Sequence, residues 1–185
     1  MEKGKHYLEK FRYCPACGSK NFNINDFKSK RCSDCGFTYY FNASAATVAI
    51  IENEEGELLV CRRACEPAKG TLDLIGGFVD PGETTEEAIS REIREETGLD
   101  ISKIEGVSKS GLTYLFSEPN TYNYSNFVVH TTDTFFHIVV PSSCQITPSD
   151  DVAETFWVRR EDIRLDAFGL DSIREGFRRW LSAHH

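Results

Sequence analysis

Apolar residues gather along the chain in short runs bounded by turn residues, which is the pattern of β-strands. The expected strands are 44–51, 58–64, 107–117, 135–140 and 155–158. The first two flank the segment "ENEEGE", so we expect a hairpin with Gly56 in its loop. The segment between the second strand and Gly76 shows no clear period, and we expect a looser connection there.

Apolar residues near the end of the chain recur with a helical period instead of forming a short continuous run. Ile173, Phe177, Trp180 and Leu181 recur at helical spacing. This spacing predicts an amphipathic helix that packs its apolar face on the rest of the domain.

A second helix is predicted at 85–97, because both of its ends carry local signals. Thr84 followed by Glu87 is a capping box, in which the side chain of each residue accepts a hydrogen bond from the backbone N–H of the other. Gly98 is a C-terminal stop. Strands around two helices predict a mixed α+β domain.

Three carboxylates share one face of the helix at 85–97. At about 100° per residue, Glu92, Glu95 and Glu96 fall within one arc, whereas Ile89 and Ile93 turn toward the core. Such a face is tolerable in solvent, but it also supplies the oxygen ligands that a hard divalent cation such as Mg²⁺ requires. Both interpretations, a solvated charged helix and a metal site, fit the spacing.

Glycines precede this acidic helix. We expect Gly76, Gly77 and Gly82 to let the loop before the helix fold back, so that Glu83 supports the carboxylate face.

Composition limits the function classes. The chain has 185 residues, of which 40% are hydrophobic and 27% charged, which is typical of one globular domain with a small appendage. We expect a cytoplasmic protein without a membrane partner, because no apolar stretch approaches the roughly 18 residues of a membrane span and the start lacks a secretory signal. A net charge of −8 disfavours sequence-independent binding of nucleic acid. A small phosphorylated substrate is compatible with this charge if a metal ion bridges the repulsion.

Four of the seven cysteines form a metal-binding pattern. Two CxxC pairs, each followed by glycine, hold Cys14, Cys17, Cys32 and Cys35. Four thiolates at this spacing predict a structural Zn²⁺ site in a zinc ribbon over residues 11–40, which is too small to fold without its metal. We interpret Cys61, Cys65 and Cys144, which have no such partners, as small apolar residues.

The acidic helix completes a family signature. Gly77, Glu83 and the segment "REIREETGL" that begins at Arg91 match every fixed position of the Nudix box. This resemblance implies a Nudix α/β/α sandwich over residues 41–183 and hydrolysis of a nucleoside diphosphate linked to another moiety, with Mg²⁺ or Mn²⁺. It also implies that Glu92, Glu95 and Glu96 are metal ligands and that Arg91 orients them by ion pairing.

The expected chemistry follows from these charges. Cations held by the glutamates would neutralise a pyrophosphate and activate a water for attack, and one carboxylate would take the proton. Farther on, "DDVAETFWV" resembles the family's Glu-Ala-x-Trp-Phe segment, which makes Glu154 a candidate for a further metal ligand or the base. The alternative is a surface glutamate before a strand.

A ribbon directly ahead of a Nudix domain resembles the NADH pyrophosphatases. That resemblance implies a homodimer, and it implies that Tyr40 and Phe78 stack on the nicotinamide. The family's array Ser-Gln-Pro-Trp-Pro-Phe-Pro-x-Ser is matched only in part by 117–125, where Tyr122 takes the aromatic position but the tryptophan and two prolines are missing. The candidate substrate-binding residues are Tyr40, Gly77, Phe78, Glu83 and Tyr122.

Because of these departures, the substrate stays open among NAD(H), ADP-ribose, dinucleoside polyphosphates and the NAD cap of RNA, with a dinucleotide favoured and AMP as product. Two other functions are weighed against this one. The first is a non-catalytic Nudix sensor whose zinc ribbon contacts nucleic acid, helped by the basic cluster at 28–31. The second is a pyrophosphatase for nucleoside triphosphates.

Overall fold

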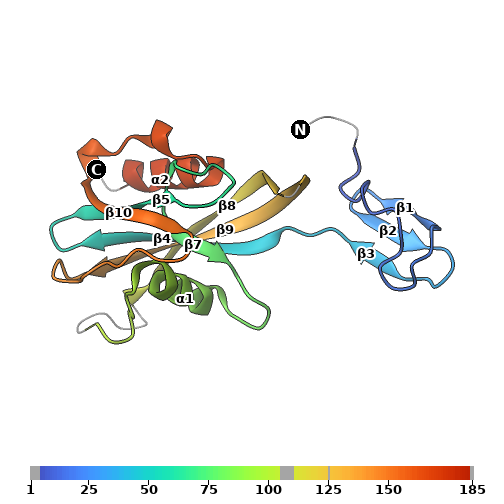
Figure 1. Ribbon diagram of the computed structural model, residues 1–185, viewed down its shortest axis with the longest axis horizontal. Coiled ribbons are helices and arrows are strands. Elements are labelled where there is room, and N and C mark those ends of the chain that lie inside the picture. The colour runs from blue at the N-terminus through green and yellow to red at the C-terminus, as the bar shows by residue number, and fades with distance from the viewer. Residues whose placement is uncertain (1–4, 105–110, 125, 184–185) are drawn as a thin grey trace. The chain divides into compact units, whose positions relative to one another are not determined.

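The computed structural model describes residues 5–104, 111–124 and 126–183. The chain divides into two compact units, Met1–Ala43 and Ser44–His185, which we call the N-terminal and the C-terminal unit (Figure 1). The first part of the strand expected at 107–117 and Ser125 of the partly matched array lie outside the described residues.

The N-terminal unit is built on a small antiparallel sheet. Its strands are β1 (Phe22–Asp26), β2 (Ser29–Cys32) and β3 (Thr38–Tyr40), in that order. The buried apolar residues of this unit are Cys14, Phe22 and Cys32, with Phe11 packed against them. So small a core stabilises a fold only with further support such as a metal ion.

The C-terminal unit contains a seven-stranded mixed sheet. Its strands are β4 (Ser44–Asn53), β5 (Glu57–Arg63), β6 (Leu72–Asp73), β7 (Ile75–Phe78), β8 (Thr113–Tyr124), β9 (Phe127–Val140) and β10 (Val152–Arg159). The order is β10-β5-β4-β9-β8, with β6 beside β5 and β7 beside β4. Strands β4 and β9 run parallel, and the other named pairs are antiparallel.

Two helices cover opposite faces of this sheet, α1 (Thr85–Thr97) and α2 (Asp171–Ala183) (Figure 1). Alternate residues of β4 divide between two cores, because successive side chains of a strand point to opposite faces. Ala49 packs in the core under α1, and Val48 packs in the core under α2. The predicted α/β/α sandwich is confirmed. Neither helix within the described ranges has the length and apolarity of a membrane span.

The local signals of α1 act as the sequence predicts. The Thr84 side chain accepts from the Glu87 backbone N–H at 3.2 Å, and the Glu87 carboxylate accepts from the Thr84 N–H at 2.9 Å. Gly98 caps the end with a left-handed φ of 75°. The expected C-terminal helix is also present, with Ile173, Phe177 and Trp180 buried.

The expected loose connection over 65–75 is partly wrong, because β6 forms within it and β7 begins at its last residue. Gly76 and Gly77 lie in β7, which pairs with Ala46–Ala49 of β4. Glycine is a weak strand former, but the position requires it: a Cβ on Gly76 would collide with the Thr47 carbonyl oxygen. Tertiary pairing therefore overrides local preference here.

Candidate active site

Arg91, in the middle of α1, is the centre of an ion-pair cluster. Its Nε and Nη2 donate to the two carboxylate oxygens of Glu83 at 2.8 and 2.9 Å, a bidentate arrangement. Its Nη1 donates to Glu92 at 2.7 Å and to Glu95 at 3.1 Å, and Nη2 also reaches the Phe78 carbonyl oxygen at 3.0 Å. These bonds raise the pKa of Arg91 and lower that of Glu83. One guanidinium thus joins three carboxylates to the end of β7.

The environments of Glu92 and Glu96 differ from that of Glu95. Glu96 is buried and accepts a hydrogen bond from the Gly76 N–H at 3.0 Å, while burial raises its pKa to about 9. Burial likewise raises the pKa of Glu92. A Cβ on Gly77 would collide with the Glu92 carboxylate, so this glycine makes room for it. Glu95 is exposed.

This arrangement fits a hard divalent cation. Glu92 and Glu96 are carboxylates held in a desolvated place, where two negative charges are unfavourable unless a cation offsets them. Arg91 forms ion pairs with Glu92 and Glu95, whereas Glu96 accepts from the Gly76 N–H. Within the described part of the chain, only the cysteine cluster brings three or more ligand atoms within 4.8 Å of one another.

A cavity of about 150 Å³ lies beside this face. Of the predicted site residues, its wall includes Gly77, Phe78, Glu96 and Tyr122. Phe78 is 46% exposed, and burial raises the pKa of Tyr122. The structure therefore brings Gly77 of β7, one glutamate of the face and two aromatic rings to one cavity.

Several polar residues of the cavity wall were not found by the sequence analysis. They are Arg63, Asp73, Asn120, Thr131, Asp133 and Asp151. Asp73 is buried, and burial raises its pKa although Arg63 forms an ion pair with it. Asp151 follows another aspartate directly before β10, and this Asp-Asp pair was the available signal.

Two predicted site residues are not among those that line the cavity. Glu154 is on β10, with its side chain 51% exposed and paired with Arg62 Nε, and it does not line the cavity. Tyr40 is the last residue of β3 in the N-terminal unit and is 49% exposed.

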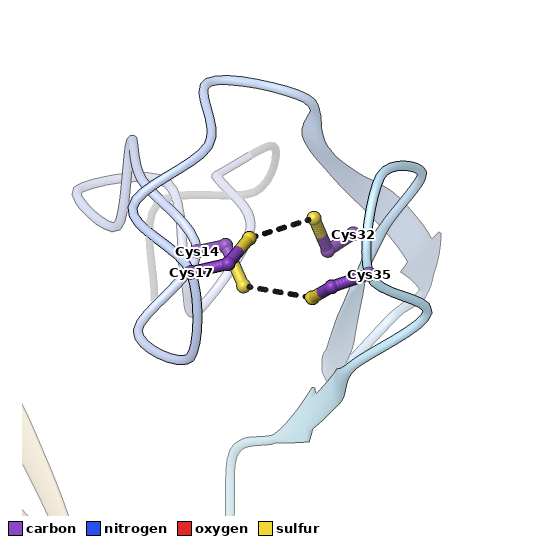
Figure 2. A group of neighbouring side chains, drawn as sticks. All are labelled: Cys14, Cys17, Cys32 and Cys35. Carbon is purple, nitrogen blue, oxygen red and sulfur yellow. Dashed lines mark hydrogen bonds between the residues drawn. The ribbon is translucent and has the colours of Figure 1, made fainter.

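The four cysteines of the N-terminal unit form the second site. Their sulfur atoms lie within 4.8 Å of one another. Figure 2 shows the two CxxC turns facing each other. The Sγ atoms of Cys14 and Cys35 are 3.7 Å apart, as are those of Cys17 and Cys32. A zinc–sulfur distance of about 2.3 Å gives a tetrahedron edge of about 3.8 Å, which matches. Backbone N–H groups, first that of Cys35, lower the pKa of Cys32 to about 7 and favour its thiolate. This cluster is compatible with the predicted zinc ribbon.

Several known proteins resemble this chain in sequence. The NAD-capped RNA hydrolase NudC of Haemophilus influenzae (strain PittGG) is 32% identical over 124 residues, 66% of this chain and 44% of that protein. The chain spans less than half the length of the curated relatives that head this comparison.

Solved structures share the fold. A NUDIX hydrolase from Nitrosomonas europaea superposes with a TM-score of 0.68 at 20% identity, covering 94% of this chain and 92% of that one. A bifunctional NMN adenylyltransferase/ADP ribose pyrophosphatase from Francisella tularensis, complexed with AMP and a Mn ion, gives 0.58 at 20% identity over 77% of this chain and 42% of that one. The family model of the NUDIX domain matches residues 42–181. The chain therefore belongs to the Nudix family.

Proposed function

We propose that this protein is a metal-dependent Nudix hydrolase that cleaves the pyrophosphate of a nucleoside diphosphate derivative and releases AMP. Its favoured substrates are a dinucleotide such as NAD(H), or ADP-ribose. The observation that carries the proposal is the carboxylate face of α1, held by Arg91 beside a cavity with aromatic walls. The names of the NudC relatives and of the Francisella structure, which holds AMP and Mn, support the same chemistry.

Each part of the site has a task in this reaction. Mg²⁺ or Mn²⁺ held by Glu92, Glu95 and Glu96 would neutralise the pyrophosphate and activate the attacking water. Glu96 is kept in place by the Gly76 N–H, and Arg91 orients the other two glutamates. A charged group that holds metal ligands in place affects metal affinity or activity by about 10–100-fold. Among the carboxylates that could take the proton, Asp151 lines the cavity and Glu154 stays a candidate.

We assign a structural Zn²⁺ to Cys14, Cys17, Cys32 and Cys35, whose spacing suits it. A homodimer, as in the NADH pyrophosphatases that the chain resembles, would let Tyr40 of one chain act beside Phe78 of another. Free cysteines throughout the described residues fit a cytoplasmic protein.

Phe78→Ala is expected to raise KM for a dinucleotide about tenfold and to leave kcat less affected. Stacking on an aromatic ring is worth about 1–3 kcal/mol per base, and it contributes binding rather than bond cleavage. Tyr40→Ala should act alike. Steady-state kinetics with NADH and ADP-ribose, together with melting temperatures, check this. Tyr114→Ala, which removes an exposed ring outside the cavity, is the control. Equal loss of both substrates with a lowered melting temperature would mean that the ring is packing rather than stacking.

A second candidate substrate is RNA with an NAD cap, the substrate class in the name of the NudC relatives. Residues 1–43 contain eight Lys and Arg against four Asp and Glu, whereas residues 44–185 contain thirteen against twenty-five. The N-terminal unit also exposes Tyr13, Phe27 and Tyr39. Basic groups with exposed aromatic rings suit single-stranded RNA. The N-terminal unit therefore has a positive net charge, although the net charge of the whole chain is negative.

A substrate panel tests the proposed function. With Mg²⁺ or Mn²⁺, we expect AMP from NAD(H) and ADP-ribose, and no turnover after chelation of the metal. An NAD-capped oligonucleotide with a kcat/KM above that of free NAD, and an advantage that falls as salt rises, would favour the RNA substrate. Release of pyrophosphate from nucleoside triphosphates alone would instead support the triphosphate pyrophosphatase. Tight binding of ADP-ribose without hydrolysis would support the sensor.

A further inference from the structure

The cavity contains buried polar residues in its wall. Asn120 of β8, Thr131 and Asp133 of β9 and Thr47 of β4 all line it, and all four are buried. Asp133 is only 4% exposed. Buried carboxylates are rare unless they are paired or meet a ligand.

The sheet register places Asn120, Thr131 and Asp133 together next to Phe78. Thr131 is directly opposite Asn120 in the antiparallel pair, and Asp133 lies two residues along on the same face. Ala46 of β4 pairs with Asp133 on one side and with Phe78 on the other. Asn120, Thr131 and Asp133 therefore adjoin the aromatic wall of the cavity.

The hydrogen bonds of Asp133 are incomplete. Its Oδ2 accepts from the Ser172 hydroxyl of α2 at 2.5 Å and from Asn120 Nδ2 at 3.3 Å. Its Oδ1 and the Thr131 hydroxyl have no hydrogen-bond partner within residues 5–104, 111–124 and 126–183. A buried acceptor without a donor is unfavourable, whereas a donor brought by a ligand would satisfy it. Ser172 and Asn120 donate to Oδ2, whereas Oδ1 keeps its capacity to accept a hydrogen bond.

The other charged residues of the cavity wall also favour a ligand group that donates hydrogen bonds. They are Arg63, Asp73, Glu96 and Asp151. The one cation among them, Arg63, is already bound to Asp73 and to the Pro67 carbonyl oxygen. A carbonyl or carboxylate group of a ligand would therefore face acceptors, because an ionised carboxylate can only accept.

We infer that Asp133, with Thr131, forms a specificity subsite that accepts a hydrogen bond from an NH₂ group on a heterocycle of the substrate. This inference rests on the proposed function and extends it to the substrate class. Two groups of a nicotinamide–adenine dinucleotide supply this chemistry: the carboxamide of the nicotinamide and the exocyclic amine of the adenine. A base carrying an oxo or carboxylate group at that position is rejected.

The test compares three dinucleotides with Mg²⁺. They are NAD, its analogue with nicotinic acid in place of nicotinamide, and its analogue with hypoxanthine in place of adenine. We expect the wild type to disfavour one analogue by about 10- to 100-fold in kcat/KM, the range for a lost hydrogen bond to a charged group. The disfavoured analogue identifies which NH₂ group is read.

Asp133→Asn should remove this preference, because an amide can donate as well as accept. The matched control is Asp166→Asn, which changes an exposed aspartate outside the cavity and should keep the wild-type preference. Thermal melting shows whether Asp133→Asn is folded. If it is not, the wild-type comparison decides: equal kcat/KM for all three dinucleotides overturns the subsite.

Failure of the proposed function is detected separately. If no dinucleotide is hydrolysed, calorimetry measures binding of AMP against IMP, and of nicotinamide mononucleotide against nicotinic acid mononucleotide. Preferential binding of the amino or carboxamide form supports the subsite without catalysis. Equal binding within both pairs, or no binding of any of the four, contradicts it.

Discussion

Glu96→Gln should lower kcat by about 10²–10³-fold, because it removes a charged ligand from the proposed metal site while keeping its shape. The glutamine oxygen can still accept the hydrogen bond from the Gly76 N–H, so the contact between α1 and β7 is retained. Steady-state kinetics with ADP-ribose over a range of Mg²⁺ concentrations measure the loss. Glu86→Gln, an exposed position on the same helix, is the control and should keep wild-type rates. A near-normal rate for Glu96→Gln would exclude this helix from the chemistry.

The same variant should also be at least as stable as the wild type without metal. Burial raises the pKa of Glu96 in the folded protein to about 9, above the ordinary glutamate value of 4.5. The unfolded chain therefore releases this proton first, and the wild type loses stability as pH rises from about 4.5 to 9. Melting temperatures in a chelator should show an advantage for Glu96→Gln that grows over this window and is absent below it. A variant that melts lower throughout would show that the carboxylate itself supports the fold.

Cys32→Ser should abolish tight zinc binding and unfold the N-terminal unit. Thiolate ligation and folding are coupled in so small a unit, and structural zinc contributes about 10–16 kcal/mol in zinc-finger peptides. Elemental analysis should find about one zinc per wild-type chain. Hydrogen exchange should lose protection over residues 11–40 before α1 is affected. Cys65→Ser changes an exposed cysteine in the C-terminal unit, and it should alter neither the zinc content nor the hydrogen-exchange protection. A protected N-terminal unit in metal-free protein would contradict the zinc site.

Local signals predicted the acidic helix well. The capping box at Thr84 and the glycine stop at Gly98 act within one turn, so they specify the ends of α1 without reference to the rest of the chain. The two CxxC pairs are equally local, and their sulfur atoms meet as the spacing predicts. The mixed sandwich followed from the family signature.

Features that depend on pairing between strands distant in the sequence could not be predicted from local patterns. β7 forms because β4 lies beside it, and β8 continues to Tyr124 because β9 pairs with it along this length. Helical spacing placed Glu92, Glu95 and Glu96 on one arc, but only the packing of β7 shows that two of them are buried and one is exposed. For the same reason, Asp133 could not be found, since its place at the cavity depends on strand register.

The parallel pairing of β4 with β9 has a consequence for folding during synthesis. The two strands lie on opposite sides of α1 in the sequence, so the centre of the sheet closes only after the helix and β8 have left the ribosome. The N-terminal unit has short-range pairings and can fold first, as domains commonly do during translation. The nascent chain therefore carries a folded N-terminal unit while helix α1 still lacks a complete sheet to pack on.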